Sequence, residues 1–174
     1  MLLGFKRQFE PYVEDGSKRH TIRARRKKRP RPGEVCHCYV DPRQKSMRLL
    51  GRWPCTKVEE IKIEALNYPH LRIVIEGYVL DAIETEQLLW RDGFRPTKAQ
   101  ASYGLSSTAL AWQFWEKRLK RARFVGDLIH WDFDHPVLKP ERRGGAAPLQ
   151  AATASARSNK ARAPRSATRQ SQRP

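Results

Sequence analysis

A lysine, a threonine and an arginine lie within eight residues near the start of the chain, in the segment GSKRHTIR at positions 16–23. An amine can accept the proton of a nearby hydroxyl when burial or neighbouring cations lower the pKa of the ammonium, and a guanidinium can hold a carbonyl or phosphate oxygen. Lys18, Thr21 and Arg23 are therefore candidates for a small anion-handling site. The alternative is a solvated basic loop before an edge strand, because Lys-x-x-Thr is a common spacing.

Local backbone preferences indicate how these side chains reach a common face. Gly16 can adopt a positive φ, so a short helix can end there in a sharp turn that leads to Lys18. If the following segment is extended, Thr21 and Arg23 lie on one face of a strand and Ile22 on the other, toward a core. We therefore expect one face of this strand to carry the chemistry and the other to pack.

Several ordered elements make the chain resemble a known family. The pattern Gly16-x-Lys18-x-x-Thr21-x-Arg23 is similar to the Gly-x-Lys-x-x-Thr-x-Arg signature of ASCH domains, which are small β-barrels related to the PUA fold of RNA-modifying proteins. Further elements resemble the family's first strand, its turn into the second barrel strand, its acidic-Gly-Phe element and its closing strand: Leu2–Phe5, Pro32–Glu34, Arg91–Phe94 and Val125–Trp131. The resemblance covers residues from about 1 to 135.

The resemblance implies roles for individual residues. In the characterised bacterial branch of the family, the motif lysine and threonine act with a glutamate to hydrolyse the acetyl amide of N4-acetylcytidine. Carried over by motif, Lys18 would activate, Thr21 would attack, and Asp92 would be the third catalytic residue, in the position where that branch has a glutamate. An aspartate is one methylene shorter, and a proton-transfer partner must come within about 3 Å of its target or reach it through a water. Other members are ribonucleases or RNA-binding proteins, so a ribonuclease and a non-catalytic RNA-binding module are the alternatives.

The pattern of apolar residues predicts three further strands before the closing one. Alternation is typical of a strand over residues 34–40 and of a longer extended segment over about 47–63. Gly51 and Pro54 indicate bulges or bends in that long segment. Residues 71–79 are predicted to return as the next strand, antiparallel to it.

Two helices are predicted in the second half of the chain. An apolar stripe indicates a helix from Asp81 to Trp90, which Asp92 closes and after which Gly93 supplies the turn. A second helix is expected to begin at Ser106 or Ser107 and to run to about Arg121. These elements predict an α+β fold, and the resemblance implies that residues 1–136 form a small PUA-like (ASCH) mixed β-barrel with flanking α-helices.

The charge of the chain is strongly basic and is concentrated in two segments. Lys and Arg number 35 against 18 Asp and Glu, a formal net charge of +17. Seven of the nine residues from Arg23 to Arg31 are basic, and residues 139–174 contain nine basic residues against Glu141 alone. Residues 137–174 are rich in Ala, Ser and Arg and poor in large apolar residues, so we expect a disordered tail.

Such an excess of positive charge favours a polyanionic partner. RNA or a nucleoside is the expected ligand, and the tail is expected to add affinity for RNA or DNA through counterion release. Solvated surface charge is the alternative for both clusters, and a nuclear-import signal is a further alternative for the first. Arg19, Arg23 and Arg25 are the arginines that we expect to bind substrate. Tryptophans that lie among cations are candidates for stacking on bases, although most are expected in the core: Trp112, Trp115 and Trp131.

The cysteines indicate a reducing compartment rather than a metal site. Cys36, Cys38 and Cys55 are too few and odd in number for a disulfide framework. In a strand, Cys36 and Cys38 would lie on one side and His37 on the other, so the histidine cannot easily join them as a zinc ligand. We therefore expect buried thiols, no metal and no cofactor. No run of 18 apolar residues and no export signal is present, so a cytoplasmic protein without a membrane partner is expected.

Overall fold

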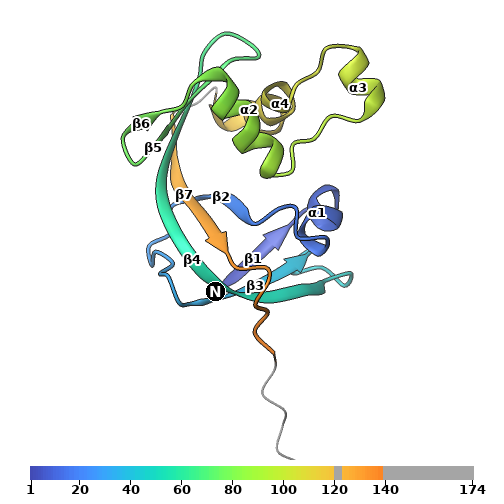
Figure 1. Ribbon diagram of the computed structural model, residues 1–174, viewed down its shortest axis with the longest axis vertical. Coiled ribbons are helices and arrows are strands. Elements are labelled where there is room, and N and C mark those ends of the chain that lie inside the picture. The colour runs from blue at the N-terminus through green and yellow to red at the C-terminus, as the bar shows by residue number, and fades with distance from the viewer. Residues whose placement is uncertain (120–122, 139–174) are drawn as a thin grey trace, which may run out of the picture. The chain divides into compact units, whose positions relative to one another are not determined.

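Paired β-strands form the centre of the computed structural model, which describes residues 1–119 and 123–138 (Figure 1). In chain order the strands are β1 (Leu2–Phe5), β2 (His20–Ala24), β3 (Val35–Val40), β4 (Arg48–Ala65), β5 (Leu71–Ile75), β6 (Tyr78–Val79) and β7 (Phe124–Trp131). The long strand β4 pairs antiparallel with β3 near its start and with β5 and β7 further along, so it joins two parts of the sheet. β1 extends the sheet beyond β3 in parallel, β2 pairs with β7, and β6 pairs with β5.

Backbone pairing does not close this sheet into a barrel. In the described part of the chain, β1 pairs with β3 alone and β2 with β7 alone, so both are edge strands. Two arginine side chains donate across the gap to carbonyls of β1: Arg23 to Gly4 at 2.5 Å and Arg26 to Leu2 at 3.0 Å. The expected α+β class is confirmed, and the expectation of a barrel is corrected to an open, seven-stranded mixed sheet. The guanidinium groups of Arg23 and Arg26 thus make contacts at the edge where a closed barrel would have backbone hydrogen bonds between β1 and β2.

Two predicted strands differ from the structure in detail. The sequence predicts one strand over residues 71–79, whereas the structure divides it into β5 and β6 at Glu76 and Gly77. These two residues have φ of 47° and 88°, as a tight hairpin turn of the primed type requires. Gly51 and Pro54, where bends were predicted in β4, are both paired with β3, and the register of β4 shifts nearby instead, with Leu50 and Thr56 as the extra residues.

Helices cover parts of the sheet and are capped by their own sequence. They are a 3₁₀ turn η1 (Arg7–Phe9) and the helices α1 (Glu10–Glu14), α2 (Ala82–Arg91), α3 (Lys98–Ser102) and α4 (Ser107–Leu119). Asp81 caps α2 by accepting from the Glu84 backbone N–H at 2.8 Å, which confirms the predicted start. At the start of α4, Ser106 accepts from the Ala109 N–H, and the Glu86 carboxylate of α2 accepts from two further backbone N–H groups. This contact joins α2 to α4, whereas the short helix α3 was not predicted.

The interior is built from apolar side chains of the strands and of α1 and α2. Side chains that are essentially fully buried include Leu3, Val13, Ile61, Ile63, Ile73, Leu89, Leu128 and Ile129. Cys36, Cys38 and Cys55 are also buried and are free thiols, as the sequence predicts. Within the described ranges, no group of three or more His, Cys, Asp or Glu side chains is arranged to hold a metal ion.

Two sequence expectations concern segments at the limit of the described chain. The predicted tail over 137–174 lies outside the described residues except for Val137 and Leu138, and so does the predicted end of the last helix at Arg121. Among the helices that are described, none has the length and apolar character needed to cross a membrane.

Candidate active site

Four of the residues singled out in the sequence line one small cavity. Its volume is about 120 Å³, and its polar lining consists of Lys18, Thr21, Arg23 and Asp92, together with Lys6. Aromatic side chains form most of its remaining wall: Phe5, Phe9, Phe94, Phe114 and Trp115. The turn after α1 supplies Lys18, strand β2 supplies Thr21 and Arg23, and the end of α2 supplies Asp92. The cavity therefore lies beside the gap between β1 and β2, where segments distant in sequence meet.

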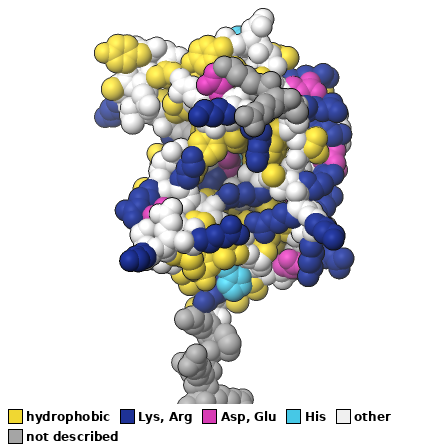
Figure 2. Space-filling view, turned by 180° about the vertical axis from the view of Figure 1, so that it is seen from behind, with side chains coloured by type: hydrophobic (Ala, Val, Ile, Leu, Met, Phe, Trp, Pro, Cys, Tyr) yellow, Lys and Arg dark blue, Asp and Glu magenta, His cyan; other side chains and the backbone are white. Residues whose placement is uncertain are grey.

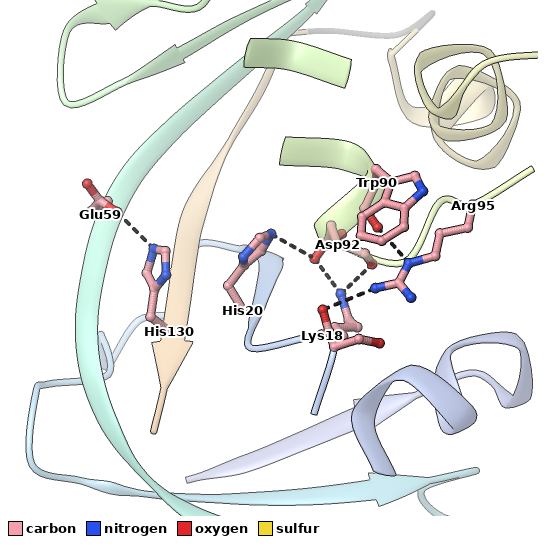
Figure 3. A network of polar contacts seen from close by, with 8 residues as sticks. Lys18, His20, Glu59, Trp90, Asp92, Arg95 and His130 are labelled. Carbon is pink, nitrogen blue, oxygen red and sulfur yellow. Dashed lines mark hydrogen bonds and ion pairs between the residues drawn. The ribbon is translucent and has the colours of Figure 1, made fainter. Parts of the chain in front are cut away.

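The Lys18 ammonium and the Asp92 carboxylate form a buried ion pair (Figure 3). Lys18 donates to Oδ1 of Asp92 and, at 2.5 Å, to the backbone oxygen of the same residue. The two side chains are only 2% and 6% exposed, so both charges are removed from water. This burial lowers the pKa of Lys18 to about 8 and raises the pKa of Asp92 above its usual range. A neutral amine at Lys18 is thus accessible near physiological pH.

The turn before Lys18 depends on glycine. Gly16 has φ of 73°, and a Cβ there would come within 2.5 Å of the Phe133 ring. After this turn the backbone N–H of Lys18 donates to the Tyr12 carbonyl of α1 at 2.7 Å. A residue with a side chain at position 16 would both strain the backbone and collide with the ring, so Gly16 fixes the direction in which Lys18 leaves the helix.

The turn after Asp92 depends on glycine in the same way. The backbone N–H of Asp92 closes α2 by donating to Leu88 at 2.8 Å, and Gly93 continues the chain with φ of 94°. A Cβ on Gly93 would lie 2.8 Å from the Phe9 ring, which is itself part of the cavity wall. The predicted helix end is confirmed, and it directs the short Asp92 side chain at Lys18.

Arg95, which was not predicted as a site residue, connects the two turns. Its Nε donates to the Trp90 carbonyl and one of its terminal nitrogens donates to the Ser17 carbonyl, both at 3.1 Å (Figure 3). The guanidinium also lies 3.9 Å from the centre of the Trp90 ring and 4.3 Å from that of Tyr12. Because Ser17 precedes Lys18 and Trp90 lies just before Asp92, Arg95 holds both partners of the ion pair in place. Its only sequence signal is its position directly after the Asp-Gly-Phe element.

Strand β2 places Thr21 and Arg23 as the alternation predicts. Thr21 is buried and borders the cavity, opposite Ile129 of β7. Arg23 lies over the Phe5 ring at 4.9 Å, and burial lowers its pKa. Ile22 is buried as expected, although it is also among the residues that line the cavity. Thr21 and Arg23 therefore line the same small cavity as Lys18.

His20 is a second residue that sequence reasoning left without a role. Its Nε2 lies 3.9 Å from Oδ1 of Asp92, and its ring lies beside that of His130, with 5.5 Å between the ring centres. His130 is in turn 2.8 Å from a carboxylate oxygen of Glu59 (Figure 3). Burial lowers the pKa of His20 to about 3, so a neutral imidazole faces the ion pair. Its proximity in sequence to Lys18 and Thr21 was the available signal.

Two of the expected substrate-binding arginines lie outside the cavity. Arg19 is directed away from it and forms two hydrogen bonds with Asp134, at 2.6 Å and 3.2 Å. Alternation alone would place Arg19 on the side of Thr21 and Arg23, but Arg19 lies before the start of β2, where its side chain is held by the Gly16 carbonyl and by Asp134. Arg25 is ion-paired with Glu60 at 2.7 Å and borders the neighbouring basic groove instead.

The three candidate tryptophans differ in how their rings pack. Trp131, expected to stack on bases, is only 2% exposed and packs against Phe5 and Trp53, so no base can reach its ring. Trp112 packs edge-on against Tyr68 and does not border the cavity. Trp115, one turn further along α4, does border it. The position of each ring relative to the sheet determines whether it borders the cavity, and the sequence alone does not specify that position.

A basic groove of about 660 Å³ adjoins the cavity. Its cationic lining is Lys6, Arg23, Arg25, Arg26, Lys117 and Arg118. Lys and Arg side chains are prominent on the face of the molecule shown in Figure 2, and acidic side chains are fewer there. The first basic cluster of the sequence thus contributes to a concave surface beside the candidate catalytic residues.

Comparisons of the chain with protein-family models, with curated proteins and with solved structures found no match.

Proposed function

We propose that this protein is an ASCH-like, PUA-like hydrolase that removes an acyl group from the exocyclic N4 amine of a cytosine base. The observation that carries the proposal is the buried Lys18–Asp92 ion pair in a cavity that Thr21 and Arg23 also line. These are the residue types that amide hydrolysis by a threonine nucleophile requires: a base, a hydroxyl, an oxyanion partner and a second proton carrier. Their order in the sequence supports the family assignment.

In the first step, Thr21 attacks the acyl carbonyl. The neutral amine of Lys18 takes the hydroxyl proton while the threonine oxygen forms a bond to the carbonyl carbon. Arg23 stabilises the negative charge that develops on the carbonyl oxygen. The bond from carbon to N4 then breaks, and the proton passes from Lys18, with the help of Asp92, to the departing cytosine amine.

In the second step, water restores the enzyme. Lys18 removes a proton from the water as it attacks the ester carbonyl on Thr21, and the threonine oxygen leaves as the hydroxyl with that proton. The products are the unmodified cytosine base and a carboxylic acid. The low pKa of Lys18 supports its role as a base in both steps, because its neutral form is present near neutral pH.

The size of the cavity supports a small reacting group. A volume of about 120 Å³ is below the roughly 300–1,000 Å³ of pockets that enclose drug-sized ligands. An acyl amide and the adjacent part of a base can enter such a space, whereas a whole nucleoside extends beyond it. The aromatic wall supplies flat apolar surface against which a base can pack.

The test is incubation of the purified protein with N4-acetylcytidine, with cytidine and acetate measured by chromatography. We expect turnover by the wild-type protein and its loss in Lys18→Ala and Thr21→Ala. Lys45→Ala changes an exposed lysine outside the cavity and is the matched control, which should keep full turnover. Absence of cytidine, or turnover that neither cavity variant reduces, would reject the proposal.

A non-catalytic RNA-binding module is the second candidate, and the cations of the basic groove favour it. Phosphate contacts position a nucleic acid and supply affinity without any chemistry. In that case the protein binds RNA with a strong dependence on salt concentration and leaves both N4-acetylcytidine and RNA intact. Shortening of RNA in the same samples would instead indicate a ribonuclease.

A further inference from the structure

The cavity and the basic groove are parts of one continuous recess. Lys6, Ile22 and Arg23 border both spaces, and so do Phe114 and Trp115 of α4. A ligand group in the cavity therefore leaves it directly into the groove. Because the groove is more than five times larger by volume, about 660 Å³ against about 120 Å³, most of a ligand that reaches the cavity lies in the groove.

The charges of the groove are matched to a polyanion. Six of its lining residues are Lys or Arg, and none of its described lining residues is Asp or Glu. Within the described part of the chain, Lys6, Lys117 and Arg118 form no ion pair with a carboxylate, and all three are exposed. Among the described residues these three cations have no carboxylate counter-ion, although they line a concave surface, which favours an extended ligand that carries several negative charges.

Aromatic rings lie where the two spaces meet. Phe114 is 38% exposed, with the Lys6 ammonium 4.4 Å from its ring centre, and Trp115 is partly buried. Exposed aromatic rings beside cations are the usual means of binding unpaired bases, since every base has a face that can stack. An acidic peptide would be attracted by the same cations, but it has no flat group that uses the rings and the narrow cavity together.

We propose that the substrate is a nucleotide within a single-stranded nucleic acid, whose backbone lies in the basic groove while the modified base enters the cavity past Phe114 and Trp115. The deacylation step rests on the proposed function, whereas the binding of the strand does not. A base that is paired within a duplex cannot reach so small a cavity, because an enzyme must take the base out of the stack first. Single strands are therefore bound in preference to duplexes.

Binding of a short fluorescein-labelled oligonucleotide, followed by fluorescence anisotropy, tests the location of the strand. In the full-length protein, the double variant Lys117→Gln/Arg118→Gln should weaken binding at least tenfold. It should also reduce the slope of log K against log salt by about 1.4, since each phosphate contact to a single strand contributes about 0.7. The matched control is Lys45→Gln/Lys98→Gln, which removes the same charge at exposed positions outside the groove. This control variant should retain most of the affinity for the oligonucleotide.

Competition experiments identify the class of ligand. Unlabelled single-stranded RNA and DNA should both displace the probe, and the stronger competitor identifies the sugar that the groove prefers. Duplexes of the same sequence and a poly-glutamate peptide of similar charge should compete at least tenfold less well. Equal competition by the duplex or the peptide, or equal affinity of the groove and control variants, would overturn the proposal.

A kinetic comparison separates this inference from the proposed function. The groove variant should lower kcat/KM for N4-acetylcytidine within an oligonucleotide by a much larger factor than kcat/KM for the free nucleoside, which carries no phosphate. If no substrate is hydrolysed, the proposed function fails, and the binding experiment alone decides the location of the strand. If both substrates are hydrolysed and the groove variant affects them equally, the strand does not lie in the groove.

Discussion

The ammonium of Lys18 donates to both the side chain and the backbone carbonyl of Asp92, a residue 74 positions later in the chain. This double contact joins the turn after α1 to the end of α2. It brings a base and an acid together at the wall of a cavity that is otherwise largely aromatic. The buried pair is therefore both a structural link between two segments and the centre of the proposed chemistry.

Breaking this pair should destabilise the fold. Lys18→Met leaves the Asp92 carboxylate buried without its partner, and Asp92→Leu does the same to the Lys18 ammonium. Each single variant should lower the free energy of unfolding by about 3 kcal/mol or more. The double variant should lose less than the sum, with a coupling energy of at least about 1 kcal/mol. Urea denaturation followed by tryptophan fluorescence measures all three, and strictly additive losses would show that the pair is not coupled.

The pH dependence of turnover should report Lys18. The base must be unprotonated to accept a proton from Thr21, and burial lowers the pKa of Lys18 to about 8. kcat/KM should therefore rise about tenfold per pH unit below this value and level off above it. A profile measured with N4-acetylcytidine that is flat from about pH 6 to about pH 9 would contradict a role for this amine as the base.

Acid should destabilise the protein through His20. Its pKa is about 3 in the folded chain against 6.5 for an unperturbed histidine, so the unfolded chain binds more protons between these values. The contribution of His20 to stability is complete above about pH 6.5 and is lost as the pH falls toward about 3. His20→Asn should therefore flatten the dependence of the unfolding free energy on pH in this window. His70→Asn, which changes an exposed histidine, is the control, and equal slopes in both variants would refute the assignment.

Gly93→Ala should be more damaging than Gly33→Ala. Both glycines have positive φ, 94° and 86°, so both substitutions strain the backbone by about 1 kcal/mol. Only at Gly93 would the new Cβ lie 2.8 Å from a neighbouring ring, that of Phe9, whereas Gly33 has no atom within 4 Å. Thermal unfolding should show a larger loss for Gly93→Ala, by about 1–3 kcal/mol. Equal losses of stability in the two variants would mean that the Phe9 ring moves away from the new Cβ without an energetic cost.

The parts of the site that follow from local sequence were predictable. Gly16 specifies its turn, and alternation along β2 places Thr21 and Arg23 on a common side. The end of α2 at Asp92 follows from the apolar stripe of the helix and from Gly93. Each of these depends on backbone preferences within a few residues, which is why a single sequence specifies them.

The features that the sequence did not predict arise from tertiary packing. The gap between β1 and β2, which Arg23 and Arg26 bridge, depends on how far the sheet curves. The role of Arg95 depends on two turns that meet only in the folded chain. The Trp131 ring lies in the core and Trp115 lines the cavity, a difference that depends on how β7 and α4 pack in the folded chain.

The most direct test of the central claim is the comparison of Thr21→Val with Thr21→Ser in the hydrolysis of N4-acetylcytidine. Valine keeps the shape of the side chain and removes the hydroxyl, whereas serine keeps the hydroxyl and removes the methyl group. The account predicts that Thr21→Val loses at least about 100-fold in kcat and that Thr21→Ser retains measurable turnover. Turnover by Thr21→Val at the wild-type rate would show that the cavity does not use this hydroxyl as its nucleophile.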